Sequence, residues 1–283
     1  LNAIDPIKFE RQIKYFKKNF NVLSPKKFYE KIKKNKFDSK DCLLTFDDGY
    51  QSHYKYAFKI LKKYNLKGFF FPMVYNPKPN YIHHLNKIQL FLKINKDKMK
   101  ILDEIKDKIK FENPKFFKKF NKILEKIKTK NFYGSKIEII IKRLLQRELP
   151  IKLREKICKD LFRRSKIPSK IINKFYMSTY QIKRLSSLGH EIGIHTNAHY
   201  WMSSLKKNEQ KREVLKSLKY MKSKKLIKKD WTFCYPFGDY NKFTIEILKK
   251  INCKAAFAVK NQPMPIKKFK KFELKRLDCN NFL

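Results

Sequence analysis

Acidic residues and glycine are both scarce in this chain of 283 residues. Aspartate and glutamate number 25 against 70 lysines and arginines, which gives a formal net charge of +45, and there are only 6 glycines. Hydrophobic residues still make up 42% of the chain and aromatic residues 15%, which is enough for a sizeable core and excludes a disordered tail protein. At this length the chain forms one large domain or two of ordinary size.

Long apolar runs are also missing. The longest uninterrupted ones, such as residues 68–71 and 139–141, are far shorter than the roughly 20 residues that cross a bilayer, so no transmembrane helix is expected. No signal peptide is recognisable, and because the chain starts at Leu1 rather than Met we expect the N-terminus to be incomplete. A cytoplasmic or membrane-peripheral location follows as the expectation.

The five cysteines are too far apart in the sequence to form a metal knuckle or a redox pair. They are Cys42, Cys158, Cys234, Cys253 and Cys279. Three of them lie in or beside apolar segments that are predicted to be strands. Buried, reduced thiols are therefore expected, and these favour a reducing compartment.

The large positive charge is compatible with nucleic-acid binding, because clustered lysines release counterions from phosphates. Here the lysines are spread along the whole chain, and the accompanying abundance of Asn, Ile, Phe and Tyr is the bias expected from AT-rich codons. We therefore expect no nucleic-acid partner. Peripheral contact with an anionic membrane surface, or with an acidic glycan, is the interaction that the basic surface favours. The oligomeric state stays open.

Short apolar strands alternate with amphipathic helices in the first and last parts of the chain. Strands are predicted at residues 43–46, 68–71, 191–194, 232–235 and 255–259, and helices at 6–20, from 25 onward, and at 52–64, 179–188, 208–225 and 242–250. This alternation is typical of an α/β protein with parallel strands. Between the two parts, about residues 76–175 are lysine-rich and helical in period. They predict a helical insertion in a single domain of residues 1–283.

Polar and turn residues follow three of the predicted strands, at the edge where parallel β/α barrels collect their active sites. They are Asp47-Asp48-Gly49, His195-Thr196-Asn197-Ala198-His199 and Pro236-Phe237-Gly238. Two imidazoles and one carboxylate make a set of three ligands that leaves open positions on a catalytic Zn²⁺ or similar divalent ion. A second carboxylate beside the first can stay off the metal and act as a base on bound water.

These segments resemble the polysaccharide deacetylases, the NodB-homology domains of carbohydrate esterase family four. Residues 45–49 (TFDDG) match the family's first motif, and residues 195–199 (HTNAH) match the second, a histidine, a serine or threonine, two variable residues and a histidine. Residues 233–238 (FCYPFG) are similar to the third motif. The resemblance covers about residues 7–75 and 177–279, and it implies a distorted (β/α)7 barrel that carries the helical insertion.

The resemblance also implies a role for each motif residue. Asp47 would be the general base, while Asp48, His195 and His199 would hold a divalent metal, Zn²⁺ with Co²⁺ or Ni²⁺ as alternatives. The backbone N–H of Phe237 would bind the oxyanion. The implied reaction is metal-dependent hydrolysis of the acetyl group from an N-acetylated sugar of a bacterial polysaccharide or its precursor.

Two departures from the family pattern leave an alternative open. The arginine that orients the base in many members is replaced by Cys234, so another residue is expected to hold Asp47. The late leucine–x–histidine motif, which supplies the general acid, is absent from residues 274–278. The general acid is therefore unassigned, with His83 and His84 at the start of the insertion, or another residue, as candidates. The alternative is a non-catalytic glycan-binding relative of the same fold.

Overall fold

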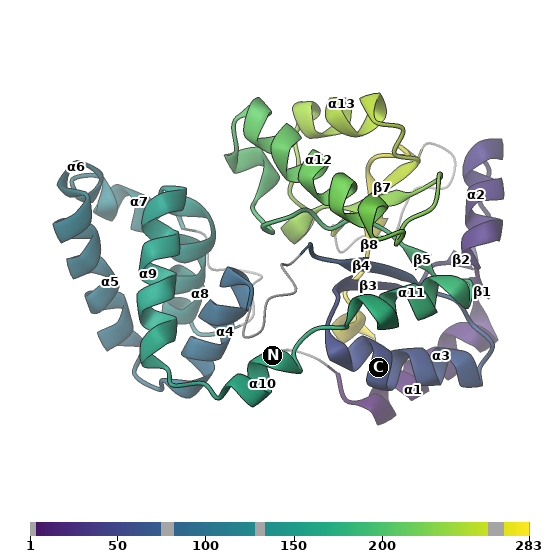
Figure 1. Ribbon diagram of the computed structural model, residues 1–283, viewed down its shortest axis with the longest axis horizontal. Helices are drawn as coiled ribbons and strands as arrows, with labels where there is room; N and C mark the ends of the chain where they lie inside the picture. Colours follow the sequence, from purple (N-terminus) through teal and green to yellow (C-terminus); the bar gives the residue numbers. More distant parts are fainter. Residues whose placement is uncertain (1–3, 75–81, 128–133, 260–268, 283) are drawn as a thin grey trace. The chain divides into compact units, whose positions relative to one another are not determined.

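The computed structural model describes residues 4–74, 82–127, 134–259 and 269–282. The chain divides into two compact units (Figure 1). The helical unit spans Pro77–Asn173, and the α/β unit is built from Ala3–Asn76 and Lys174–Leu283. The helical unit corresponds to the insertion that the sequence predicts at about residues 76–175. The assignment of both units to one domain stays a prediction.

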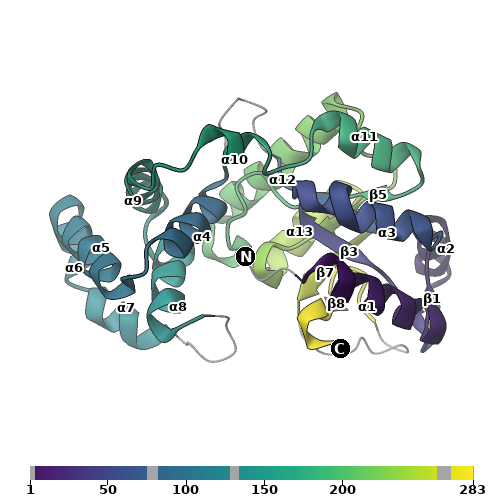
Figure 2. The ribbon, with the colours of Figure 1, turned by 90° about the horizontal axis from the view of Figure 1, so that it is seen from below.

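Strands and helices alternate along the α/β unit. In chain order its regular elements are α1 (Pro6–Asn19), β1 (Asn21–Val22), α2 (Pro25–Lys34), β2 (Asp41–Cys42), β3 (Thr45–Asp48), α3 (Phe58–Lys63), β4 (Phe69–Pro72), α11 (Thr179–Ser187), β5 (Glu191–Ile192), α12 (Lys207–Ser223), β6 (Thr232–Cys234), α13 (Lys242–Lys250), β7 (Ala255–Val259) and β8 (Leu274–Arg276). A π-helical turn, His53–Ala57, leads into α3. Helices α1, α3 and α11 lie in a row with α3 in the middle in both views (Figures 1 and 2).

The paired strands of the α/β unit run parallel. One sheet has the order β3-β4-β5 and a second the order β6-β7-β8, while β1 pairs with β2. A single parallel bridge between Ile194 and Phe233 connects the first sheet to the second. The predicted α/β class with parallel strands is therefore confirmed. Within the described residues the strands do not close into a barrel, so the (β/α)7 barrel stays a prediction.

The strand that carries the first motif differs from its prediction. β3 is Thr45–Asp48 rather than 43–46, so both aspartates belong to the strand instead of following it. Asp47 and Asp48 stay in register with Phe71 and Pro72 of β4, and the ladder ends at Pro72 because proline has no N–H to donate. Asp48 has a left-handed backbone, with φ of +70°, so the chain turns at the second aspartate itself.

The other predicted elements of the α/β unit agree with the structure to within two residues. Helix 242–250 and strand 255–259 coincide with α13 and β7. The predicted start of α2 is also confirmed, because the Ser24 side chain accepts the N–H of Lys27 and Pro25 occupies the first helical position.

The core of the α/β unit is rich in phenylalanine. Phe69 and Phe71 of β4 are fully buried, and together with Phe28 of α2 they surround Phe257 of β7 with ring centroids 5.2–6.0 Å apart. Gly193 lies against this cluster, and a Cβ at that position would come within 2.3 Å of the Phe71 ring. Its lack of a side chain lets the segment that leads to the second motif approach β4 closely.

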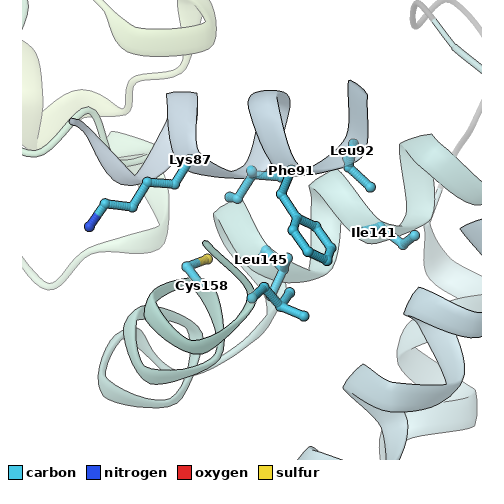
Figure 3. Close-up of a pocket in the computed structure, with 8 residues that line it drawn as sticks. Lys87, Phe91, Leu92, Ile141, Leu145 and Cys158 are labelled. Atoms are coloured by element: carbon cyan, nitrogen blue, oxygen red, sulfur yellow. The ribbon is translucent and has the colours of Figure 1, made fainter. Parts of the chain in front are cut away.

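The helical unit has a core of its own. Its helices are α4 (His84–Ile94), α5 (Lys98–Glu112), α6 (Pro114–Phe117), α7 (Phe120–Lys126), α8 (Lys136–Arg143), α9 (Ile151–Arg164) and α10 (Ser169–Asn173). Figure 3 shows part of this core, where Lys87 of α4 extends beside the thiol of Cys158 on α9. Burial lowers the pKa of Lys87 and raises that of Cys158 to about 12. The space among these side chains does not admit a water molecule, so we assign it to packing.

None of the helices in the described ranges is long and apolar enough to cross a membrane. All five cysteines are free. Cys158, Cys234 and Cys253 are buried as expected, whereas Cys42 is only half-buried and Cys279 is exposed, so the expectation of buried thiols is wrong for Cys279. Cys279 begins the short 3-10 turn Cys279–Asn281, which follows β8 and is not part of a sheet.

One acidic side chain is buried at the start of β5. Glu191 is 2% exposed, and its Oε1 accepts a hydrogen bond from the Tyr29 hydroxyl at 2.6 Å. Burial raises the pKa of Glu191 from 4.5 to about 7. The folded protein therefore holds this proton more tightly than the unfolded chain does. The stability that the neutral carboxyl contributes is fully present below pH 4.5 and is lost as the pH rises through about 7.

Glu191→Gln should therefore stabilise the protein at pH 8 and have a much smaller effect at pH 5. Glutamine keeps an acceptor for the Tyr29 hydroxyl but cannot ionise. The difference in unfolding free energy between variant and wild type should increase by about 3 kcal/mol from pH 5 to pH 8. Urea unfolding at the two pH values measures this change. An increment that does not vary with pH would show that Glu191 is not the titrating group.

Candidate metal centre and active site

The three predicted metal ligands converge beyond β3 and β5. The Nε2 atoms of His195 and His199 are 3.0 Å apart, and Asp48 Oδ1 lies 3.5 Å from the first and 3.3 Å from the second. The side chain of His195 is 2% exposed, that of His199 is 5% exposed and that of Asp48 is 16% exposed. Two ligand atoms on a tetrahedral zinc with bonds of about 2.1 Å are about 3.4 Å apart. The three atoms therefore have the spacing of one face of a zinc tetrahedron.

The chemistry of these donors also fits a cation. His195 Nδ1 lies 2.8 Å from the carbonyl oxygen of Cys234, which can only accept, so the proton is on Nδ1 and Nε2 keeps its lone pair. Asp48 Oδ1 is buried and receives no hydrogen bond from the described residues. Burial by itself raises the pKa of Asp48, but the two imidazoles and the Tyr50 hydroxyl outweigh it and hold the pKa below its usual range. An ionised oxygen near the Nε2 lone pair of His195 is a site for a positive ion.

The loop from His195 to His199 is held in an uncommon backbone conformation. Thr196 has φ of +63° and His199 has φ of +52°, the left-handed region that side chains other than glycine disfavour. The His199 N–H donates to Thr196 Oγ1 at 3.1 Å, which stabilises the reversal. These turns bring the rings of His195 and His199, which are four residues apart in the sequence, to a centroid distance of 4.7 Å.

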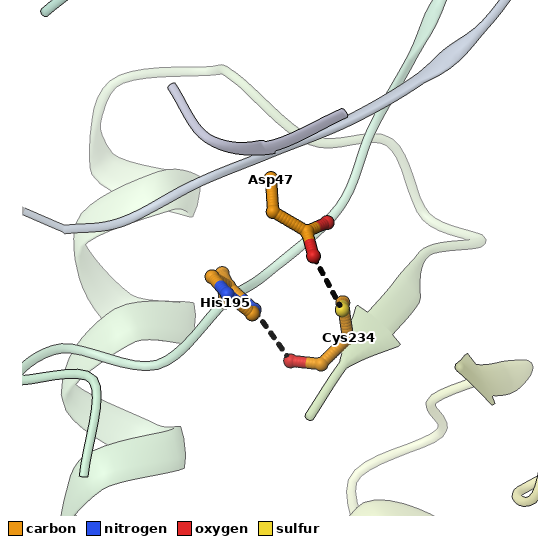
Figure 4. A group of neighbouring side chains, drawn as sticks. All are labelled: Asp47, His195 and Cys234. Carbon is orange, nitrogen blue, oxygen red and sulfur yellow. Dashed lines mark hydrogen bonds between the residues drawn. The ribbon is translucent and has the colours of Figure 1, made fainter. Parts of the chain in front are cut away.

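Asp47 lies beside the predicted metal ligands and forms a two-pronged ion pair. Arg276, the last residue of β8, donates from Nη1 to Asp47 Oδ1 at 2.8 Å and from Nη2 to Oδ2 at 2.6 Å. Arg276 Nη1 also donates to Thr45 Oγ1 at 3.1 Å. Cys234 contacts both neighbouring side chains (Figure 4). Its thiol donates to Asp47 Oδ2 at 3.5 Å, and its backbone carbonyl accepts from His195 Nδ1.

This ion pair keeps Asp47 in the form that a base requires. Burial by itself raises the pKa of the Asp47 carboxyl, but the charge and hydrogen bonds of Arg276 outweigh it and hold the pKa below its usual range. The side chain remains 29% exposed. Asp47 is thus ionised, fixed in orientation and reachable from solvent.

Arg276 is the functional residue that the sequence analysis did not identify. Because Cys234 stands where many family members have the arginine, the sequence predicts that another residue holds Asp47, but it does not indicate which one. Two signals were available. Arginine is rare here, with nine among 70 basic residues, and Arg276 ends the short segment 274–276 that continues the strand–helix alternation.

Phe237 also has a strained backbone, with φ of +57°. Its ring stacks on the Trp201 ring, with centroids 4.5 Å apart, and contacts the ring of His199, a predicted metal ligand, with centroids 4.7 Å apart. The carboxylate of Asp239 accepts the Ser203 N–H at 2.7 Å and the Ser203 hydroxyl at 2.8 Å, which ties the loops after β5 and β6 together. The oxyanion role of the Phe237 N–H stays a prediction.

The structure places the candidate acids His83 and His84 in the helical unit, at the start of α4. Their rings are 4.8 Å apart. Their role as general acid stays a prediction.

Comparison with known proteins points to one family. The sequence model of the polysaccharide deacetylase family matches residues 34–101 and 166–256, together more than half of the chain. The putative polysaccharide deacetylase YxkH of Bacillus subtilis (strain 168) is 34% identical over 84 residues, which are 29% of this chain and 29% of YxkH. The matched region is thus less than a third of that relative's length.

Two solved structures have a similar fold. The Streptococcus pyogenes deacetylase PplD, solved in complex with acetate, has a TM-score of 0.53 at 16% identity, over 98% of this chain and 83% of that one. IcaB from Ammonifex degensii has a TM-score of 0.53 at 16% identity, over 97% of this chain and 84% of that one. The family match includes all three motifs that meet at the candidate site. The chain therefore belongs to the polysaccharide deacetylase family, the NodB-homology domains of carbohydrate esterase family four.

Proposed function

We propose that the protein is a metal-dependent deacetylase that hydrolyses the acetyl amide of N-acetylated sugars in a bacterial polysaccharide or its precursor. The observation that carries the proposal is the convergence of Asp48, His195 and His199 beside the ionised carboxylate of Asp47. The proposed fold is the distorted (β/α)7 barrel. In it, the ion pair between Arg276 of β8 and Asp47 of β3 links the first strand of one sheet to the last strand of the other. Contact of the basic surface with an anionic membrane is part of the proposal.

Asp48, His195 and His199 would hold a divalent cation, Zn²⁺ or alternatively Co²⁺ or Ni²⁺. When bound, such an ion acts as a Lewis acid toward an acetyl carbonyl and toward water. The fixed tautomer of His195 directs its Nε2 lone pair to this position, because Nδ1 is occupied by the Cys234 carbonyl.

Different residues around the ligands transfer protons and stabilise the negative charge that develops during the reaction. Asp47 accepts the proton of the attacking water on a carboxylate lone pair that Arg276 leaves free. The Phe237 N–H donates to the oxyanion that develops on the acetyl carbonyl, which is worth about 3 kcal/mol for a well-placed donor. For the proton that the leaving amine requires, His83 and His84 are the candidates.

Removal of the metal should abolish acetate release. After chelation and dialysis, the protein should release no acetate from an N-acetylglucosamine oligosaccharide, and stoichiometric Zn²⁺, Co²⁺ or Ni²⁺ should restore the activity to different extents. Enzymatic assay of acetate, with metal content from elemental analysis, measures both quantities. Full activity in metal-free protein would refute metal dependence.

The alternative is a non-catalytic glycan-binding relative of the same fold. The observation that favours it is the lack of the late histidine motif, since residues 274–278 contain no histidine. It predicts that the metal-loaded protein binds the oligosaccharide without releasing acetate. The same assay, combined with calorimetric measurement of binding, distinguishes the two functions.

A further inference from the structure

One acidic side chain on α12 binds the loop that carries both histidine ligands. Glu213 Oε2 accepts the N–H of Ala198 at 2.7 Å. The backbone N–H and the side-chain amide of Asn197 donate to the same carboxylate. Glu213 and Ala198 are both partly buried. A single carboxylate thus accepts hydrogen bonds from two of the three residues that lie between His195 and His199.

These contacts matter because the loop is strained. Thr196 and His199 both have left-handed backbones, at a cost of roughly 1–2 kcal/mol for each residue other than glycine. Such conformations persist only where the surroundings over-determine them. Asn197 and Ala198 lie beyond the end of β5, so their N–H groups lie outside the strand pairing. The Glu213 carboxylate accepts a hydrogen bond from each of them. The Thr196 hydroxyl accepts the next N–H, that of His199.

We propose that Glu213 is a positioning residue of the metal centre. By holding Asn197 and Ala198, it fixes the turn that brings His199 Nε2 to 3.0 Å from His195 Nε2. Glu213 acts on the metal through the loop backbone and not as a ligand. The inference rests on the metal centre proposed above. A purely structural Glu213, which only attaches α12 to the loop after β5, would affect unfolding but not the affinity for metal.

The affinity for Zn²⁺ tests this proposal directly. Glu213→Ala should weaken Zn²⁺ binding about 10-fold or more, the usual effect of removing a partner that orients metal ligands. Glu213→Gln should lie between Ala and the wild type, because Gln Oε1 can accept the Ala198 N–H while its amide group cannot accept from Asn197. Glu246→Ala is the matched control, since Glu246 is exposed on α13 and pairs with Lys207 at 3.5 Å. It should bind Zn²⁺ like the wild type.

Competition with a chromophoric chelator gives each dissociation constant, and the Co²⁺ absorption spectrum reports the ligand geometry independently of any activity. Equal Zn²⁺ affinity in Glu213→Ala and in a metal-binding wild type would overturn the inference alone. Equal losses in Glu213→Gln and Glu213→Ala would also overturn it, because the negative charge rather than the positions of the acceptors would then matter. A wild-type protein that binds no metal would overturn the proposed function and the inference together.

A second variant keeps the test decisive where Glu213→Ala does not fold. Asn197→Ala removes one donor to the carboxylate and leaves Glu213 and Ala198 in place. It should weaken Zn²⁺ binding less than Glu213→Gln does, with an unchanged thermal unfolding midpoint of the metal-free protein. Wild-type affinity in both Asn197→Ala and Glu213→Gln would overturn the proposal.

Discussion

Asp47→Asn should keep the metal and lose the reaction. Asparagine preserves the size of the side chain and an acceptor for Arg276 but has no basicity. We therefore expect kcat for acetate release to fall by a factor of about 10² or more, the usual contribution of a positioned base. The metal content should stay near that of the wild type, since Asp47 is not one of the three converging ligands. Elemental analysis beside steady-state kinetics measures both effects.

Asp48→Asn is the matched variant, one residue along the same strand. Its Oδ1 lies 3.3 Å and 3.5 Å from the two imidazole Nε2 atoms, so removing the charge should release the metal. Activity should partly return at high metal concentration. Loss of metal from Asp47→Asn, with retention by Asp48→Asn, would reverse the two roles. Unchanged acetate release in both variants would refute the deacetylase function.

The features that the sequence predicts well are local ones. The helix 242–250 and the strand 255–259 follow from apolar periodicity and flanking residues, and both agree with the structure. The three predicted metal ligands come from two short motifs, and parallel strands bring the ends of such motifs to the same edge of the sheet. Predicting that these residues converge therefore requires only the strand order and not the detailed packing of side chains.

The features that the sequence did not predict depend on long-range contacts or on single dihedral angles. Arg276 and Asp47 are 229 residues apart in the chain, and no local pattern links them. β3 extends through Asp48 because its backbone pairs with β4, although an aspartate pair is a poor strand former. The left-handed backbone of Asp48 lets two successive carboxylates reach one site, and periodicity alone places successive strand residues on opposite faces.

The role of Arg276 has the second large expected effect. Arg276→Leu removes both hydrogen bonds to Asp47, so the carboxylate loses its fixed orientation and the positive charge that keeps it ionised. We expect kcat to fall about 10-fold or more with little change in metal content. Arg276→Lys keeps the charge but not the two-pronged geometry, and its kcat should lie between those of Leu and the wild type.

A double-mutant cycle separates an effect through Asp47 from a direct contact of Arg276 with the substrate. If Arg276 acts by orienting the base, the variant that combines Asp47→Asn with Arg276→Leu should be no slower than Asp47→Asn alone, because the base is already absent. Independent roles would instead multiply the two losses in kcat. A further 10-fold loss in the double variant would therefore assign Arg276 to the substrate, and Asp47 would need another partner to hold it in place. The thermal unfolding midpoints of all four proteins show whether breaking the ion pair, with Arg276 only 11% exposed, also changes the fold.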